Sequence, residues 1–86
     1  MAIVTLRYWA AAKEAAGTAE ETIAADTLAS ALSAAGASAG QDSVFRAVLA
    51  RSSFLIDGTP VGRRAPDAVI LDDASVIEVL PPFAGG

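Results

Sequence analysis

The amino-acid sequence predicts a single α+β domain, in which a mixed sheet of four to five strands is packed by helices. With 86 residues, the chain is long enough for one hydrophobic core. Its hydrophobic fraction of 53% makes such a core feasible and argues against disorder. Alternation indicates a strand near the start of the chain, a short apolar run indicates another near its end, and alanine-rich stretches between them are typical of helices. Strands interleaved with helices in so short a chain indicate a sheet covered by helices on one face.

The amino-terminal part predicts a strand, a short helix and a second strand. Residues 3–9 alternate, and because both alternating sets contain apolar side chains, this strand is expected inside the sheet. The alanine-rich stretch 10–16 predicts a helix that Gly17 stops, since glycine readily takes the left-handed conformation after a helix. Residues 20–25 predict the second strand, and their two glutamates are interpreted as part of its edge with no chemical role.

A second helix is predicted over residues 27–35. Asp26 is expected to cap it, because a carboxylate can accept hydrogen bonds from the free N–H groups of the first turn. Leu28 and Leu32 are four residues apart and therefore share one face of this helix. Gly36 ends it.

A third helix is predicted after a small, polar loop over residues 37–41. Either Asp42 or Ser43 opens it. Its expected apolar stripe consists of Val44, Phe45, Val48 and Leu49.

The carboxy-terminal third predicts further strands separated by turns. Residues 54–56 form a short apolar strand, and the Asp-Gly pair at 57–58 suits a tight turn. Residues 68–71 fit either a short strand or a turn of helix. A glycine-free turn over 72–75 then leads into the final apolar strand, Val76–Leu80.

The end of the chain, residues 81–86, cannot belong to the core. Two prolines at 81–82 end the last strand, because proline has no N–H for the ladder, and they stiffen the chain. Residues 84–86 have almost no side-chain volume. The sequence therefore predicts a domain over residues 1–80 and an extended, flexible tail over 81–86, able to reach about 20 Å into a partner.

The reactive group of this tail would be the α-carboxylate of Gly86. A carboxylate is a poor electrophile, whereas its acyl adenylate can be attacked by a sulfur nucleophile. The competing interpretation is a passive end, since terminal glycines are common at frayed termini. Phe83 lies beyond the last strand and is expected to anchor the tail in a partner's pocket.

Composition removes several classes of chemistry. The chain has no Cys and no His, which excludes thiolate nucleophiles, disulfides, zinc sites built on those ligands and imidazole catalysis. Its net charge of −4 argues against nucleic-acid binding and suits a partner with a basic docking surface. No apolar run is long enough to span a bilayer, and the first residues lack a signal-peptide pattern. We therefore expect a cytoplasmic protein with no metal site and no membrane partner.

Four segments of the chain resemble one known family. Residues 4–17 resemble its first strand and helix, 27–32 its second helix, 55–61 a strand and turn, and 71–86 its terminal block. The most specific part is the ending Pro-Pro-x-x-Gly-Gly. The chain thus resembles the small subunit of molybdopterin synthase, in the MoaD/ThiS group of ubiquitin-like sulfur carriers. The glycine-free turn before the last strand departs from the family's usual pattern.

This resemblance implies a ubiquitin-like β-grasp fold and a role shared with partner proteins. An E1-like adenylating enzyme would use ATP to activate Gly86, and a sulfur donor would leave a thiocarboxylate there. The carrier would then insert its tail into a large catalytic subunit, in a heterotetramer, and pass sulfur to a pterin precursor in molybdenum cofactor biosynthesis. The chain itself would bind no cofactor and would not be catalytic alone. The implied site residues are Gly85 and Gly86 at the reactive end, with Trp9, Leu80, Pro81, Pro82, Phe83 and Ala84 as partner contacts.

Other functions stay open at this stage. Carriers for cysteine or thiamin biosynthesis also end in Gly-Gly, and a ubiquitin-like modifier would be joined to target lysines through Gly86. A plain interaction domain with a passive tail is a third class. Lys13 is the only lysine, which argues against chains built through this protein's own lysines.

An apolar patch on the sheet beside the tail is also considered. Its candidate members are Tyr8, Trp9, Phe54 and Leu80. The charged pairs Arg63-Arg64 and Asp72-Asp73 are interpreted as solvated loop residues without a site.

Overall fold

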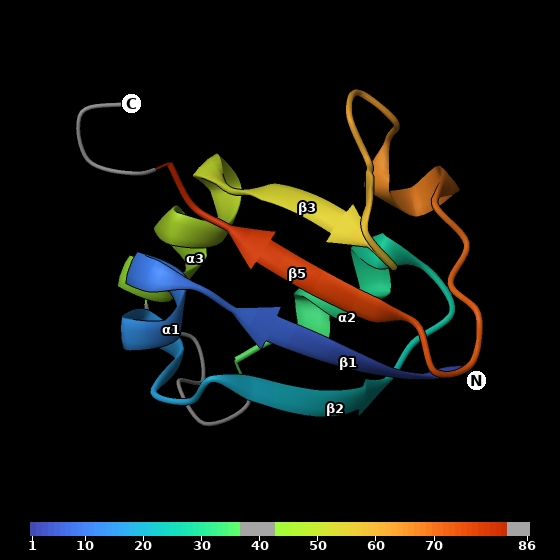
Figure 1. The fold of residues 1–86 in the computed structure, drawn as a ribbon, viewed down its shortest axis with the longest axis horizontal. Coiled ribbons are helices and arrows are strands. Elements are labelled where there is room, and N and C mark those ends of the chain that lie inside the picture. Colours follow the sequence, from blue (N-terminus) through green and yellow to red (C-terminus); the bar gives the residue numbers. More distant parts are fainter. Residues whose placement is uncertain (37–42, 83–86) are drawn as a thin grey trace.

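The computed structural model describes residues 1–36 and 43–82, and within these it contains one mixed sheet of five strands (Figure 1). The strand order is β2-β1-β5-β3-β4. β1 and β5 run parallel, and the other neighbouring pairs run antiparallel. The strands are β1 (Ile3–Tyr8), β2 (Glu20–Ala24), β3 (Ser53–Ile56), β4 (Thr59–Pro60) and β5 (Val76–Leu80). The predicted mixed sheet is confirmed, and the strand expected inside it, β1, lies between β2 and β5.

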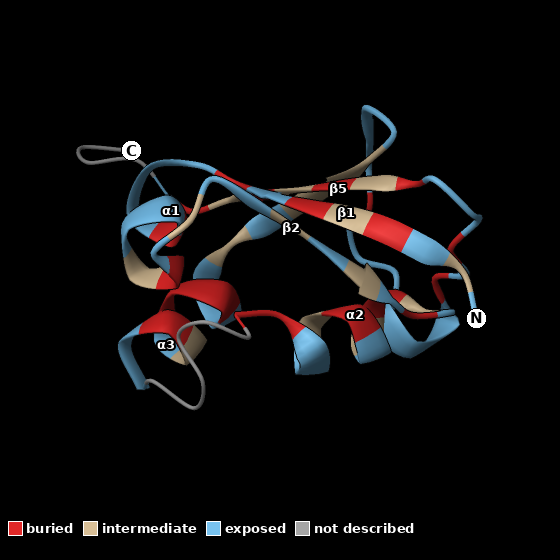
Figure 2. Cartoon of the chain, turned by 90° about the horizontal axis from the view of Figure 1, so that it is seen from below, coloured by how far each residue is buried: buried red, intermediate tan, exposed pale blue. Residues whose placement is uncertain are grey.

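The helices of the described residues leave one face of the sheet uncovered. α2 and α3 lie on one side of the sheet, and α1, which follows β1 directly, packs against α3 (Figure 2). The opposite face carries no helix. The helical segments are α1 (Ala10–Ala16), α2 (Leu28–Ala34), α3 (Ser43–Arg51) and a short 3-10 helix, η1 (Pro66–Ala68).

The core lies between the sheet and its helices. Every second residue of β1 and β5 points into it, as expected for strands with one face covered. These inward residues pack against side chains from α2 and α3. The largest fully buried side chains are Val4, Leu6, Tyr8, Leu28, Phe45, Ile77 and Val79. The prediction that helices cover one face of the sheet is confirmed, because the buried residues of β1 and β5 all lie on that face.

The cap of α2 is Thr27, not Asp26 as predicted. Thr27 Oγ1 accepts from Ser30 N–H at 3.1 Å, and Ser30 Oγ accepts from Thr27 N–H at 3.2 Å. This reciprocal pair satisfies two N–H groups at the helix start. Asp26 Oδ1 instead accepts from Ala2 N–H at 2.9 Å and ties the start of the chain to the end of β2.

The predicted stripe of α3 is correct except for Val44. Phe45, Val48 and Leu49 are buried, whereas Val44 is 63% exposed. Val44 lies in the first turn, at the margin of the stripe, and the core contact there is made by Phe45. The Phe45 ring meets the ring of Tyr8 edge-on, with centroids 5.6 Å apart.

The segment between β3 and β5 differs most from the sequence prediction. The turn at Asp57 and Gly58 is confirmed, with both residues at positive φ (50° and 84°). β4, which follows it, was not predicted. Residues 68–71 combine both predicted alternatives, because η1 ends at Ala68 and Ile70 then forms an isolated bridge with Thr27. In the glycine-free turn, Ala74 takes the left-handed conformation at φ 70°.

A buried polar contact joins the sheet to the end of α2. The Tyr8 hydroxyl donates to the Glu21 carboxylate at 2.5 Å, and the Gly36 N–H donates to the same carboxylate and to the Tyr8 hydroxyl. Tyr8 is only 2% exposed, and this burial, with the neighbouring carboxylate, raises the pKa of Tyr8 above its usual value. Glu21 therefore has a structural role that the sequence did not reveal.

Arg46 of α3 closes the same end of α2. Its guanidinium donates to the carbonyl of Leu32 at 2.7 Å and to the carbonyl of Ala35 at 2.8 Å. Carbonyls at the end of a helix have few intrahelical donors, and among the described residues the Leu32 carbonyl has in addition only the Ala35 N–H, at 3.3 Å. β1, β2 and α3 thus all fix the carboxyl end of α2.

Replacing Gly36 by alanine should destabilise the fold more than the same change at Gly17. Both glycines have positive φ, 75° and 77°, so each change carries a backbone cost of about 1 kcal/mol. At Gly36 a Cβ would also lie 2.3 Å from Cε2 of the buried Phe45, whereas nothing lies within 4 Å at Gly17. We expect Gly36→Ala to cost about 2 kcal/mol more than Gly17→Ala in urea unfolding. Equal midpoints for the two variants would contradict this packing.

Raising the pH above about 10 should weaken the fold through Tyr8, the only tyrosine. Because its pKa is raised in the folded state, its contribution is fully present below the unfolded pKa and is lost as the pH rises toward the folded value. Tyr8→Phe should cost about 1 kcal/mol at neutral pH and should remove that alkaline loss. The measurement is the unfolding free energy of both proteins at about pH 8 and pH 11. Equal alkaline losses in both would show that Tyr8 is not the titrating group.

Candidate functional site

The predicted site residues fall into two groups in the structure. Trp9, Leu80, Pro81 and Pro82 lie among the described residues, at the end of β1 and the end of β5. The remaining predicted site residues lie outside the described residues. These are Phe83, Ala84, Gly85 and Gly86.

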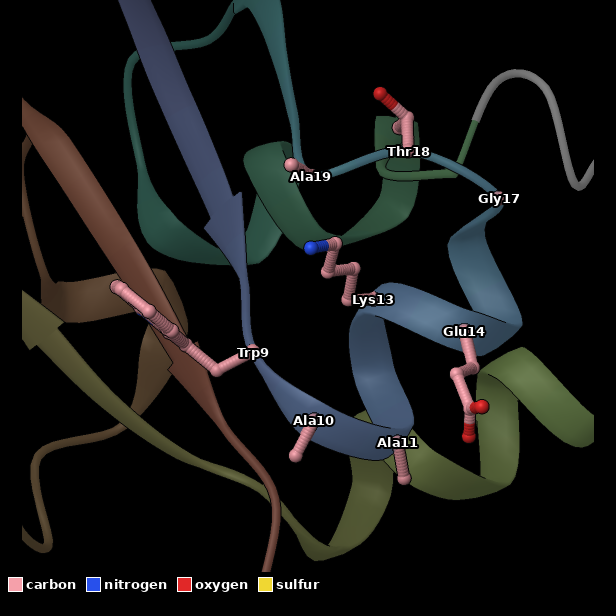
Figure 3. A pocket seen from close by; sticks show the side chains of 8 residues that line it. All are labelled: Trp9, Ala10, Ala11, Lys13, Glu14, Gly17, Thr18 and Ala19. Atoms are coloured by element: carbon pink, nitrogen blue, oxygen red, sulfur yellow. The ribbon is translucent and has the colours of Figure 1, made fainter.

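Trp9 and Leu80 come together on the uncovered face of the sheet. β1 and β5 are in parallel register, with Arg7 opposite Glu78. The Trp9 N–H continues this ladder by donating to the Val79 carbonyl at 3.3 Å. Trp9 therefore lies next to Leu80, and its side chain extends over β5 (Figure 3). Trp9 is 41% exposed. It therefore presents a large apolar surface on the uncovered face of the sheet.

The other two candidates for the apolar patch lie on the opposite face. Tyr8 points into the core, and Phe54 is half-buried and packs against the same core. The physical reason is the alternation of side chains along a strand, which sends neighbouring residues to opposite faces. The predicted patch is therefore wrong for Tyr8 and Phe54 and retains Trp9 and Leu80.

A row of side chains crosses the uncovered face beside this pair. The register places its members opposite one another on successive strands, from β2 to β4. Its members are Glu20, Arg7, Glu78, Leu55 and Pro60. Sequence analysis missed this row, although Arg7 and Glu78 are two residues from Trp9 and Leu80 and so share their face.

Arg7 is already paired within this row. Its Nε lies 3.7 Å from Glu20 Oε2, and both side chains are largely exposed, so the pair stabilises the fold little. Its guanidinium carbon also lies 5.5 Å from the centre of the Trp9 ring. Arg7 thus supports the exposed ring of Trp9 on the sheet.

The chain turns sharply between Trp9 and α1. Trp9 is extended, at φ −119° and ψ 151°, and caps α1 without a side-chain hydrogen bond. Ala10 then has φ 48°, a left-handed conformation that costs a non-glycine residue about 1–2 kcal/mol. Because of this turn, Trp9 keeps its backbone hydrogen bond to β5 while α1 continues on the other side of the sheet.

The tail begins at the centre of the sheet. β5 has a neighbour on each side, and its last residue, Leu80, pairs with Ser53 of β3. Pro81 is buried and Pro82 is exposed. The point from which the tail starts is therefore fixed by packing, directly beside Trp9.

A pocket of about 850 Å³ lies between α1 and the start of β2 (Figure 3). Small residues form most of its wall, and its charged side chains are Lys13 and Glu14. Among the described residues, no group of three or more acidic side chains is placed to hold a metal ion. Within the same residues, no helix is long and apolar enough to cross a membrane. The lining residues are Trp9, Ala10, Ala11, Lys13, Glu14, Gly17, Thr18 and Ala19.

Solved structures share this fold over nearly the whole chain. Small archaeal modifier protein 1 from Methanosarcina acetivorans has a TM-score of 0.81 and 23% identity, covering 100% of this chain and 98% of its own. The same-named protein from Haloferax volcanii has a TM-score of 0.76 and 18% identity, covering 98% and 99%. A complex of subunits 1 and 2 of molybdopterin-converting factor from Helicobacter pylori 26695 has a TM-score of 0.67 and 20% identity, covering 98% and 99%.

These structures establish the ubiquitin-like β-grasp fold. Because their sequence identities to this chain are low, they show the fold alone and not the function. Comparison with curated protein sequences found no match. The model of the ThiS family matches residues 6–86, which include the second half of β1, the whole of β5 and the Gly-Gly end. The chain therefore belongs to the ThiS family of ubiquitin-like sulfur carriers.

Proposed function

We propose that this protein carries sulfur as a thiocarboxylate on Gly86 and is the small subunit of a molybdopterin synthase. The observation that carries the proposal is the point from which the tail starts. The tail starts from the central strand β5, at Pro81 and Pro82, beside the exposed Trp9 and Leu80. A partner that binds this face of the sheet is thereby placed to receive the end of the chain.

The chemistry requires two steps at the Gly86 carboxylate. In an E1-like enzyme, a carboxylate oxygen attacks the α-phosphate of ATP, pyrophosphate leaves and an acyl adenylate forms. Hydrosulfide then attacks the acyl carbon, the bond to the AMP oxygen breaks and AMP leaves, which gives the thiocarboxylate after loss of a proton. The chain has no His and no Cys, so partner enzymes supply the acid–base groups and the sulfur.

The contribution of this chain is recognition and placement. Its buried core fixes β5, and two prolines at 81–82 restrict the first backbone angles of the tail. Trp9 supplies a rigid aromatic surface of the kind that dominates binding energy in protein interfaces. The same face would serve the adenylating enzyme and then the large catalytic subunit, because both must reach Gly86.

Molybdopterin synthesis is preferred because the Helicobacter structure is a complex of the two subunits of molybdopterin-converting factor. Conjugation to other proteins is the second candidate, favoured by the likeness to small archaeal modifier proteins. Carriers for thiamin or cysteine synthesis would use the same activated tail. Cytoplasmic location stays a prediction.

Deleting Gly86 should abolish sulfur loading without affecting the fold, because Gly86 has no side chain and the last core residue among the described residues is Val79. The purified chain is incubated with the E1-like enzyme of its own host, ATP and a sulfide source. Intact mass should increase by the difference between a sulfur and an oxygen atom. The deletion variant should show no increase and an unchanged unfolding midpoint.

Two other outcomes of this experiment decide against the proposal. No mass change in the full chain, with a partner enzyme that loads its own known carrier, would exclude a sulfur carrier of this type. Attachment of Gly86 to lysines of added proteins, without the sulfur product, would favour the modifier function instead.

Replacing Trp9 by alanine should weaken the complex with the adenylating enzyme by about tenfold or more, because a large exposed aromatic contact is lost. Ile70→Ala is the matched control, since Ile70 is 71% exposed but lies in the loop before β5. Calorimetric titration gives both affinities. Equal effects of the two changes would show that the uncovered sheet face is not the docking surface.

A further inference from the structure

Glu78 stands at the middle of the uncovered sheet face. It lies on β5, the central strand, with Val76 and Leu80 on the same face of that strand. Leu55 of β3 lies opposite it on one side and Arg7 of β1 on the other. Glu78 is half-buried, so its carboxylate is set among apolar side chains on three of its four sides.

The Glu78 carboxylate makes no hydrogen bond and no ion pair within residues 1–36 and 43–82. The nearest cation in register, Arg7, is directed at Glu20, 3.7 Å away, and at the ring of Trp9. Within the described residues, the Glu78 carboxylate is therefore left without a protein donor and open to hydration. This contrasts with Glu21 on the other face, whose carboxylate accepts from two donors.

Docking of a partner would remove that hydration. A partner that covers Trp9 and Leu80 must also cover Glu78, because Leu80 is only two residues away on the same face. A carboxylate that loses water without gaining a donor strongly opposes binding. The partner must therefore place a donor, and most favourably a cation, against this carboxylate.

The charge of the chain limits the kind of partner. The net charge is −4, and the nearby Arg7 is held by Glu20, so the face repels phosphate-rich surfaces such as nucleic acids and anionic membranes. A protein surface that combines an apolar pocket with an arginine or lysine fits all of these features.

We infer that Glu78 is a specificity-determining contact that pairs with an arginine or lysine of the enzyme that activates Gly86. The inference rests on the proposed function, because it identifies the partner by its action on the tail. Glu78 takes no part in the chemistry. It selects a partner with a cation at this position and rejects one with an anion.

The test compares three variants in adenylation by the purified E1-like enzyme of the same host. Glu78→Lys reverses the charge, and Glu78→Gln keeps the shape while removing the charge. Asp67→Lys is the control, because it changes the net charge equally but lies on η1, which packs against α2 on the helix side. The readouts are kcat and KM for the carrier from pyrophosphate release, at low and high salt, with the unfolding midpoint of each variant.

Glu78→Lys should raise KM roughly 10- to 100-fold, and Glu78→Gln about 3- to 10-fold, with kcat unchanged. Asp67→Lys should change KM by less than about twofold, and high salt should narrow the gap between wild type and Glu78→Lys. If both Glu78 variants match the control, the inference is wrong while the carrier function stands. If the wild type itself is never adenylated, the proposed function fails, and the inference fails with it.

Discussion

The parallel pairing of β1 with β5 is the constraint on which the rest of the structure depends. It joins Thr5 to Val76 and Tyr8 to Val79, so segments from the two ends of the chain form the centre of the sheet. Parallel neighbours need a long crossover connection, and here the intervening chain supplies the helices that bury their inner face. The same pairing brings Trp9, at the end of β1, beside the start of the tail.

The two faces of the sheet differ in exposure and in the pairing of their polar side chains. On the inner face, Tyr8 and Glu21 hold the end of α2, and the Tyr8 hydroxyl, the Gly36 N–H and Glu21 Oε1 are hydrogen-bonded to one another. On the outer face, Trp9 is exposed and the Glu78 carboxylate has no protein partner in the described part of the chain. An exposed aromatic side chain beside an unpaired carboxylate is suited to contact with a second protein. The proposed carrier function would need this division, because the protein would have to remain folded while different enzymes bind the same side.

Much of the fold was predictable because it depends on local patterns. Alternation identified β1, an apolar run between a turn and two prolines identified β5, and an alanine-rich stretch identified α1. Contacts between distant segments were not predictable, since they depend on register. Thr27 rather than Asp26 caps α2, because Asp26 binds the start of the chain. Glu21 of β2 accepts a hydrogen bond from Tyr8 of the neighbouring strand β1. For the site, Trp9 and Leu80 were identified by family resemblance, whereas the isolation of Glu78 required knowing where Arg7 points.

The central claim is that the helix-free face of the sheet is the docking surface for the enzyme that activates the tail. Nuclear magnetic resonance of the isotope-labelled chain, titrated with the unlabelled E1-like enzyme, tests it directly. The account predicts that signals of Trp9, Glu78 and Leu80 shift or broaden first, while those of α2 and α3 stay unchanged. Changes concentrated on α2 and α3, with the signals of the uncovered face unaffected, would contradict it.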